Sequence, residues 1–97
     1  MSTQQKKLTK LEEQIIDALA NDYENLEQIR NMLDQPIPDS KIKTTLWTLI
    51  QEGYIACYAP TKMTMKIVAH PERQHLDDYW YALTNRGEQL LITLETH

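Results

Sequence analysis

The side chains best suited to binding chemistry stand between residues 40 and 52. At about 100° per residue, helical spacing puts Ile42, Leu46, Leu49 and Ile50 on one apolar stripe. The same spacing predicts an opposite face of Thr44, Thr48 and Gln51, flanked by Ser40, Lys41 and Trp47, with Lys43 nearer the core edge. Lysines and hydroxyls suit phosphates, and threonine and glutamine suit base edges in a major groove. We therefore expect double-stranded DNA to contact this face; an ordinary solvated helix face is the alternative.

Three further features bear on nucleic-acid contact. Lys62 and Lys66 fall in a later polar segment, from which they could reach a phosphate backbone, although scattered surface lysines would look the same. Trp47 could pack on a sugar or base, but packing under neighbouring strands or in a dimer contact is the favoured interpretation. Lys6, Lys7 and Lys10 could form a basic arm, but a solubilising tail, with residues 1–8 as a flexible basic segment, is the favoured interpretation.

Catalytic and metal chemistry find little support. The three histidines and the single cysteine, Cys57, do not have zinc-binding spacing. Cys57 lies in an apolar segment and is interpreted as an inert core residue. Two glycines, both assigned to helix ends, cannot form a phosphate-binding loop. We expect no enzyme, no cofactor and no metal.

Charge is unevenly distributed along the 97 residues, whose net charge is −4. Residues 11–39 carry eight acids and one arginine, whereas residues 40–70 carry four lysines and one acid. A basic centre within an acidic chain is compatible with specific nucleic-acid binding and argues against strong nonspecific binding. Length favours one domain over residues 1–97, and no apolar run reaches membrane-spanning length. The single cysteine and a polar N-terminal segment without the pattern of a secretory signal favour a cytoplasmic protein.

Local signals predict two helices before residue 39. Thr9 and Glu12 have the spacing of a capping box, which starts a helix over about residues 9–21. Asn25, with a glutamine three residues later, starts a second, and two prolines from Pro36 onward end it. These helices must support the polar face described above.

The third helix, over about residues 40–52, carries that face. Asp39 or Ser40 is its predicted N-cap, and Gly53 occupies the position of a left-handed residue after its last turn.

Beyond Gly53 the pattern becomes that of strands. Strands are predicted at 54–58, in part of 63–69 and at 78–83, with Trp80 on the opposite face from Tyr81. Thr84 caps a final helix, where Leu91, Ile92 and Leu94 exceed what one core face needs. These three residues are the candidate interface of a homodimer; a fully used core stripe with one exposed isoleucine is the alternative.

Two segments resemble a known family. Trp47-Thr-Leu-Ile-Gln-Glu-Gly-Tyr-Ile55 resembles the junction between a recognition helix and a wing, and Tyr79-Trp-Tyr-Ala-Leu-Thr-Asn-Arg-Gly87 resembles the closing strand of a wing. Both occur in bacterial regulators of the MarR, PadR and ArsR kinds. The resemblance implies an α+β winged helix-turn-helix, with a three-helix core, a β-hairpin wing and a C-terminal helix. It implies a homodimeric, sequence-specific transcriptional regulator.

Two departures from the pattern of this family leave a second interpretation of the function open. The segment between the strands, about residues 60–77, is longer than a usual wing, and the chain is acidic overall. A winged-helix module that binds protein instead of DNA is the alternative, supported by possible surface aromatics at Trp47, Trp80 and Tyr58.

Overall fold

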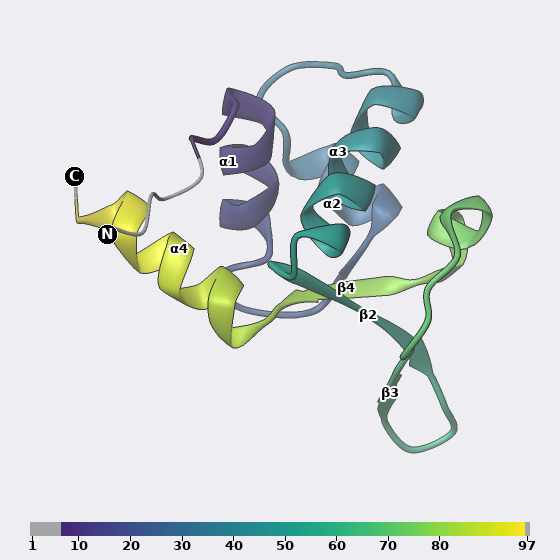
Figure 1. The fold of residues 1–97 in the computed structure, drawn as a ribbon. Helices are drawn as coiled ribbons and strands as arrows, with labels where there is room; N and C mark the ends of the chain where they lie inside the picture. Colours follow the sequence, from purple (N-terminus) through teal and green to yellow (C-terminus); the bar gives the residue numbers. More distant parts are fainter. Residues whose placement is uncertain (1–6, 97) are drawn as a thin grey trace.

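The protein has an α+β architecture. A computed structural model describes residues 7–96, in which four α-helices accompany a four-stranded antiparallel sheet (Figure 1). The helices are α1 (Lys10–Ala18), α2 (Leu26–Met32), α3 (Asp39–Gln51) and α4 (Asn85–Glu95). The strands are β1 (Glu24–Asn25), β2 (Ile55–Pro60), β3 (Met65–Ile67) and β4 (Trp80–Leu83), and a 3-10 helix, η1 (Arg73–Asp78), precedes β4. Residues 1–6, most of the predicted tail, and His97 lie outside the described residues.

Side-chain caps explain where three of these helices begin. The Thr9 hydroxyl accepts from the Glu12 amide at 3.1 Å, and the Glu12 carboxylate accepts from the Thr9 amide at 2.9 Å. Asn25 forms the equivalent reciprocal pair with Gln28 at the start of α2. The Thr84 hydroxyl accepts from the amide three residues later in α4, at 3.1 Å. All three predicted caps are confirmed, and each satisfies helix amides that would otherwise lack a partner.

The start of α3 differs from the prediction. Neither Asp39 nor Ser40 is the N-cap; Pro38 takes that position, and no side chain caps the helix. The Asp39 carboxylate instead lies 2.9 Å from Arg30 Nε, so an ion pair with α2 has replaced the expected cap. The predicted end is confirmed, because Gly53 has φ +84° directly after the last turn.

The sheet has the order β1-β4-β2-β3, and its register decides which side chains face the helices. Cys57 stands opposite Tyr81, and Ile55 stands opposite Leu83. Directly opposed residues in antiparallel strands point to the same face. Ile55, Cys57 and Tyr81 are 2%, 1% and 0% exposed, so this is the covered face of the sheet. The predicted alternation in β4 follows, since Trp80 then points to the other face.

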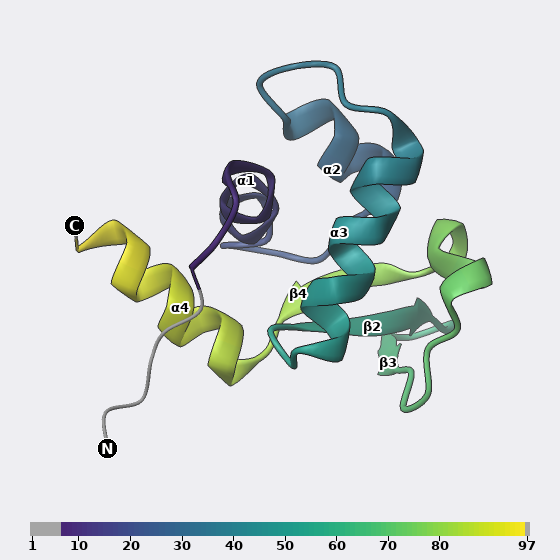
Figure 2. The same ribbon diagram turned by 45° about the horizontal axis from the view of Figure 1, so that its top comes forward.

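The covered face and three helices share one hydrophobic core. Helices α1, α2 and α3 all lie on the same side of the sheet (Figures 1 and 2). The fully buried side chains in the core come from α1, α2, α3, β2, β4 and η1, and include Ile15, Ile16, Ile29, Ile42, Leu46, Leu49, Cys57, Leu76 and Tyr81. None of the helices described between residues 7 and 96 has the length and apolarity needed to cross a bilayer.

Gly87 is required for a reason that its position in the sequence did not indicate. It lies inside the first turn of α4, and a Cβ built there would come 2.1 Å from the backbone oxygen of Tyr54. Packing therefore excludes a side chain, whereas the backbone conformation does not. This close approach fixes α4 against the chain that follows α3.

Candidate nucleic-acid interface

Helix α3 presents its polar face to solvent, as its spacing predicted. Ile42, Leu46 and Leu49 are completely buried. Ser40, Lys41, Thr44 and Gln51 are exposed, and Lys43, Trp47 and Thr48 are half-buried. The exposed face of α3 thus combines the ammonium group of Lys41, the hydroxyls of Ser40 and Thr44, and the side-chain amide of Gln51.

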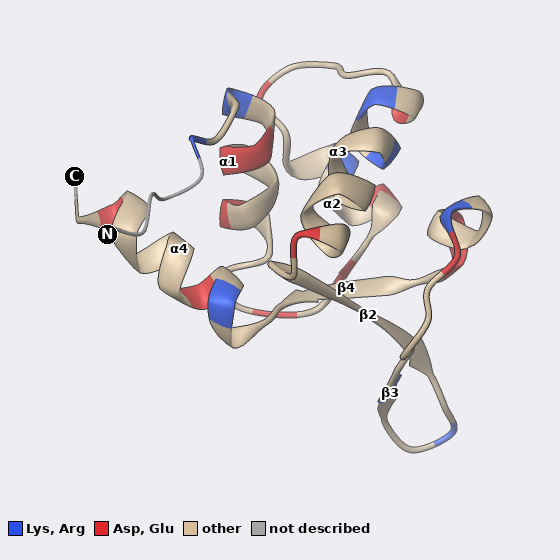
Figure 3. Ribbon diagram, viewed as in Figure 1, with Lys and Arg blue, Asp and Glu red and all other residues tan. Residues whose placement is uncertain are grey.

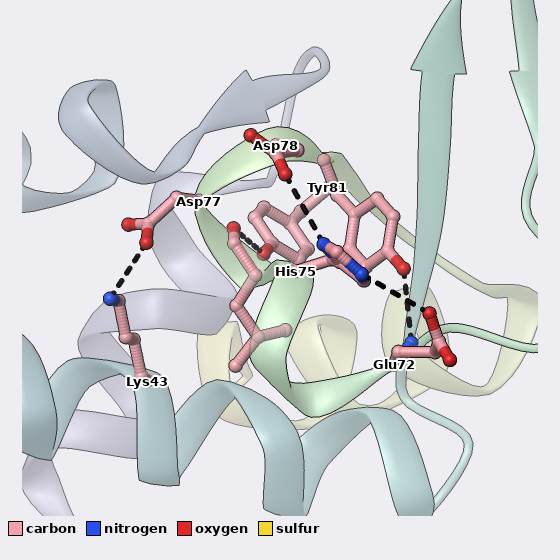
Figure 4. A network of polar contacts seen from close by, with 8 residues as sticks. Lys43, Glu72, His75, Asp77, Asp78 and Tyr81 are labelled. Carbon is pink, nitrogen blue, oxygen red and sulfur yellow. Dashed lines mark hydrogen bonds and ion pairs between the residues drawn. The ribbon is translucent and has the colours of Figure 1, made fainter.

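The 3-10 helix η1 borders this face and changes its charge. Arg73 Nη2 donates to the Thr44 hydroxyl at 3.1 Å, which brings a guanidinium onto the polar face. Lys43 Nζ lies 2.9 Å from Asp77 Oδ2, and this pair neutralises the lysine nearest the core edge (Figure 4). The cations at the face are therefore Lys41 and Arg73, in place of the expected Lys41 and Lys43. Sequence reasoning missed Arg73 because it stands 29 residues from Thr44.

The position of η1 is fixed from several directions. Leu76 is 1% exposed, and its backbone oxygen accepts a hydrogen bond from the buried Tyr81 hydroxyl. His75 Nε2 lies 3.3 Å from a Glu72 oxygen, and His75 Nδ1 lies 3.5 Å from an Asp78 oxygen (Figure 4). Leu76 and the Tyr81 hydroxyl therefore anchor η1 to the core, and the His75 contacts join residues of the segment itself. Arg73 and Asp77 are thereby held beside α3, where they contact Thr44 and Lys43.

The other predicted contacts lie on the β2–β3 hairpin. Lys62 and Lys66 are both exposed on it, and the hairpin extends away from the helices (Figures 1 and 3). Its tip is ordered by Thr61, whose hydroxyl donates to the Thr64 backbone oxygen at 2.8 Å and accepts from the Thr64 amide at 3.1 Å. The two lysines thus stand on a defined projection, separate from the face of α3.

Trp47 packs against the hydrophobic core and is only partly exposed. This agrees with the packing role favoured for it, and it leaves the smaller polar side chains as the outermost groups on α3.

The three candidate dimer residues have different surroundings. Leu91 is 9% exposed and belongs to the core cluster, and Leu94 packs on that cluster. Ile92 is 51% exposed. Within one chain, therefore, Ile92 is the member of the set with open apolar surface.

Cys57 has the environment of a structural thiol. It is 1% exposed on the covered face of the sheet, and burial raises the pKa of its thiol to about 12. Burial also raises the pKa of the Tyr81 hydroxyl above its ordinary value, with a smaller contribution from Cys57. Among residues 7–96, no cluster of three or more His, Cys, Asp or Glu side chains is arranged to hold a metal ion.

Comparison with protein families, with curated proteins and with solved structures found no match to this chain. The case for a function therefore depends on the geometry described above.

Proposed function

We propose that the chain is a winged-helix domain that binds double-stranded DNA and acts as a sequence-specific transcriptional regulator. In this proposal α3 enters the major groove, and the β2–β3 hairpin is the wing that contacts the phosphate backbone. The observation that carries the proposal is the solvent face of α3. It is free of acidic side chains from Ser40 to Gln51, and Arg73 adds a cation to it.

Side-chain chemistry indicates which residues would contact phosphates and which would contact base edges. Lys41 and Arg73 suit phosphate oxygens, as do Lys62 and Lys66 on the hairpin. Thr48 and Gln51, further along α3, suit base edges. Two of the nearby acids, Asp39 and Asp77, are paired with Arg30 and Lys43, which reduces the repulsion that they would exert on phosphate.

A homodimer fits this proposal. Exposed Ile92 on α4 provides a small apolar contact, and a two-fold axis would predict palindromic half-sites. Such a regulator would act in the cytoplasm, where the buried Cys57 thiol would stay reduced. Sedimentation of the chain and of Ile92→Ser tests the dimer independently of DNA.

Selection from a random-sequence duplex library, followed by fluorescence anisotropy on the enriched duplex, tests the proposal. Lys41→Ala should weaken binding to all duplexes and reduce the slope of log affinity against log salt by about one unit, because one phosphate contact is lost. Thr48→Ala and Gln51→Ala should instead change the preferred sequence. Lys7→Ala removes an exposed lysine that belongs neither to α3 nor to the hairpin and serves as the matched control.

The decisive variant combines Lys41→Ala, Thr44→Ala and Gln51→Ala, all at exposed positions where the fold should tolerate alanine. Duplex binding should be lost while the circular dichroism spectrum is kept. Unchanged binding by a folded triple variant would overturn the proposal, as would failure of the library to enrich any duplex.

A further inference from the structure

The face of the sheet turned away from α1, α2 and α3 is apolar and aromatic. One cross-strand row runs over all four strands: Asn25 on β1 is opposite Trp80 on β4, which is opposite Tyr58 on β2, which is opposite Ile67 on β3. The flanking pairs are Ala56 with Ala82 and Pro60 with Met65. Because opposed residues share a face, these side chains form one surface, called here the open face.

The described helices leave the open face uncovered. Helices α1, α2 and α3 lie over the other side of the sheet, and α4 runs away from its end (Figures 1 and 2). Tyr58 and Trp80 keep part of their surface exposed, and Ile67 is 58% exposed. A contiguous surface of tyrosine, tryptophan and isoleucine has the composition of the centre of a protein interface.

A pocket at one side of the open face adds a specific feature. Its volume is about 310 Å³, and its lining includes Tyr58 and Ala82 of the open face together with Asp22, Tyr23 and Glu88. Tyr23 meets Tyr58 edge to face, with ring centroids 4.9 Å apart. Asp22 and Glu88 are both exposed, and neither forms an ion pair with another residue between 7 and 96. Two carboxylates beside two aromatic rings make a pocket suited to a cation.

We propose that the open face binds a segment of another protein in which apolar side chains stand next to an arginine or lysine. The apolar side chains would pack on Trp80, Tyr58 and Ile67. The neighbouring cation would enter the pocket between Asp22 and Glu88, against the ring of Tyr23 or Tyr58. The proposal does not rest on DNA binding, because its residues lie on the face of the sheet turned away from α1, α2 and α3 (Figures 1 and 2). The hairpin contributes Ile67 to this face, whereas Lys66, the neighbouring residue, points to the opposite face.

The charge of the pocket favours a basic protein segment over two other occupants of the open face, nucleic acid and a second copy of the chain. Nucleic acid would bring phosphates toward Asp22 and Glu88, which repel them. A second copy, packed through a two-fold axis at this face, would add its own two carboxylates to the same interface, where like charges repel. A basic and apolar segment satisfies both the pocket and the aromatic surface.

A library of short random peptides displayed on phage, selected against the full chain, supplies the probe. Enriched peptides should carry arginine or lysine beside apolar residues. Synthetic copies should bind Tyr58→Ser and Glu88→Lys at least about tenfold more weakly than the unaltered chain, because each change removes a central contact. Asp34→Lys reverses an exposed charge in the connection between α2 and α3, on the far side of the helices from the sheet, and should leave affinity unchanged (Figure 1).

A charge swap separates the pocket from a general effect of net charge. Replacing the basic residue of the peptide by glutamate should abolish binding to the unaltered chain and restore it on Glu88→Lys. Ile67→Ser, at a more exposed position than Tyr58, repeats the apolar test if Tyr58→Ser proves unstable by thermal circular dichroism.

Four outcomes would overturn the proposal. Enriched peptides could lack basic residues, or bind Tyr58→Ser and Ile67→Ser as tightly as the unaltered chain. Asp34→Lys could weaken binding as much as Glu88→Lys does. Finally, sedimentation could show a dimer that Tyr58→Ser separates, in which case the occupant is a second copy. Duplex binding by Glu88→Lys, measured in parallel, should not weaken, so failure here and failure of the DNA proposal are distinguishable.

Discussion

The two faces of the sheet are built from similar residues but have different surroundings. The covered face contributes Ile55, Cys57 and Tyr81 to the core. The open face carries Trp80 and Tyr58, and no helix lies over it (Figure 1). Trp80 and Tyr81 are adjacent in β4 but lie on opposite faces of the sheet, because side chains alternate along a strand. Residue type alone does not separate them; the difference lies in what packs above each face.

The two faces of the sheet also differ in whether their residues stabilise the fold or are available to bind a partner. Atoms on the covered face are already removed from water within the chain, so they stabilise the fold and cannot contact a partner. The open face and the polar face of α3 contribute less to stability, and both have groups available to other molecules. We therefore expect variants on the covered face to change the free energy of unfolding, and variants elsewhere to change affinity.

A matched pair of isoleucines gives the largest expected contrast. Ile55 on β2 is 2% exposed and Ile67 on β3 is 58% exposed. Ile55→Ala should lower the free energy of unfolding by about 2–5 kcal/mol, because it removes packed atoms and leaves a cavity. Ile67→Ala should cost less than about 1 kcal/mol, since most of its surface already meets water. Urea denaturation followed by tryptophan fluorescence measures both, and equal losses would contradict the distinction between the faces.

Local signals were enough to predict much of this fold. The caps at Thr9, Asn25 and Thr84 depend on residues three apart, and Gly53 needs only its own backbone conformation. The alternation in β4 is equally local. Boundaries were less accurate: the helix predicted over 9–21 is assigned to Lys10–Ala18.

The features that sequence reasoning missed depend on tertiary contacts. Strand β1 has two residues, and it is defined by its pairing with β4 and not by its own pattern. Residues 73–78 were expected to be mainly loop, followed by the start of a strand, yet Leu76 anchors η1 in the core. The contact between Lys43 and Asp77 joins residues 34 apart, so no spacing rule could have indicated it.

Alkaline pH should weaken the covered face specifically. Burial raises the pKa of the Cys57 thiol from 9.0 to about 12, so above about pH 9 the unfolded chain releases this proton while the folded chain keeps it. The unfolded state then binds fewer protons, and the free energy of unfolding falls as pH rises. The burial of Tyr81 acts in the same direction. Each group contributes a slope of at most about 1.4 kcal/mol per pH unit.

Urea denaturation between about pH 8 and about pH 10.5 measures this slope. Cys57→Ala should make the slope shallower, whatever its effect on stability at neutral pH. Ile55→Val changes the same face without removing a titratable group and should keep the original slope. Identical slopes in Cys57→Ala and in the unaltered chain would show that the thiol does not carry the effect.

Breaking the ion pair between Lys43 and Asp77, beside α3, should give the smallest change in the free energy of unfolding. The same substitution also tests the DNA proposal. Lys43 and Asp77 keep 33% and 61% of their side-chain surface exposed, so Asp77→Asn should change the free energy of unfolding by less than about 1 kcal/mol. The same change frees the Lys43 charge at the edge of the polar face. Affinity for the selected duplex should rise severalfold, and the salt slope should steepen by up to about one unit. Asp78→Asn is the matched control, because it changes net charge equally while its carboxylate lies beside His75. An equal gain in both variants would assign the effect to net charge, and no gain in either would show that Lys43 lies outside the surface that contacts DNA.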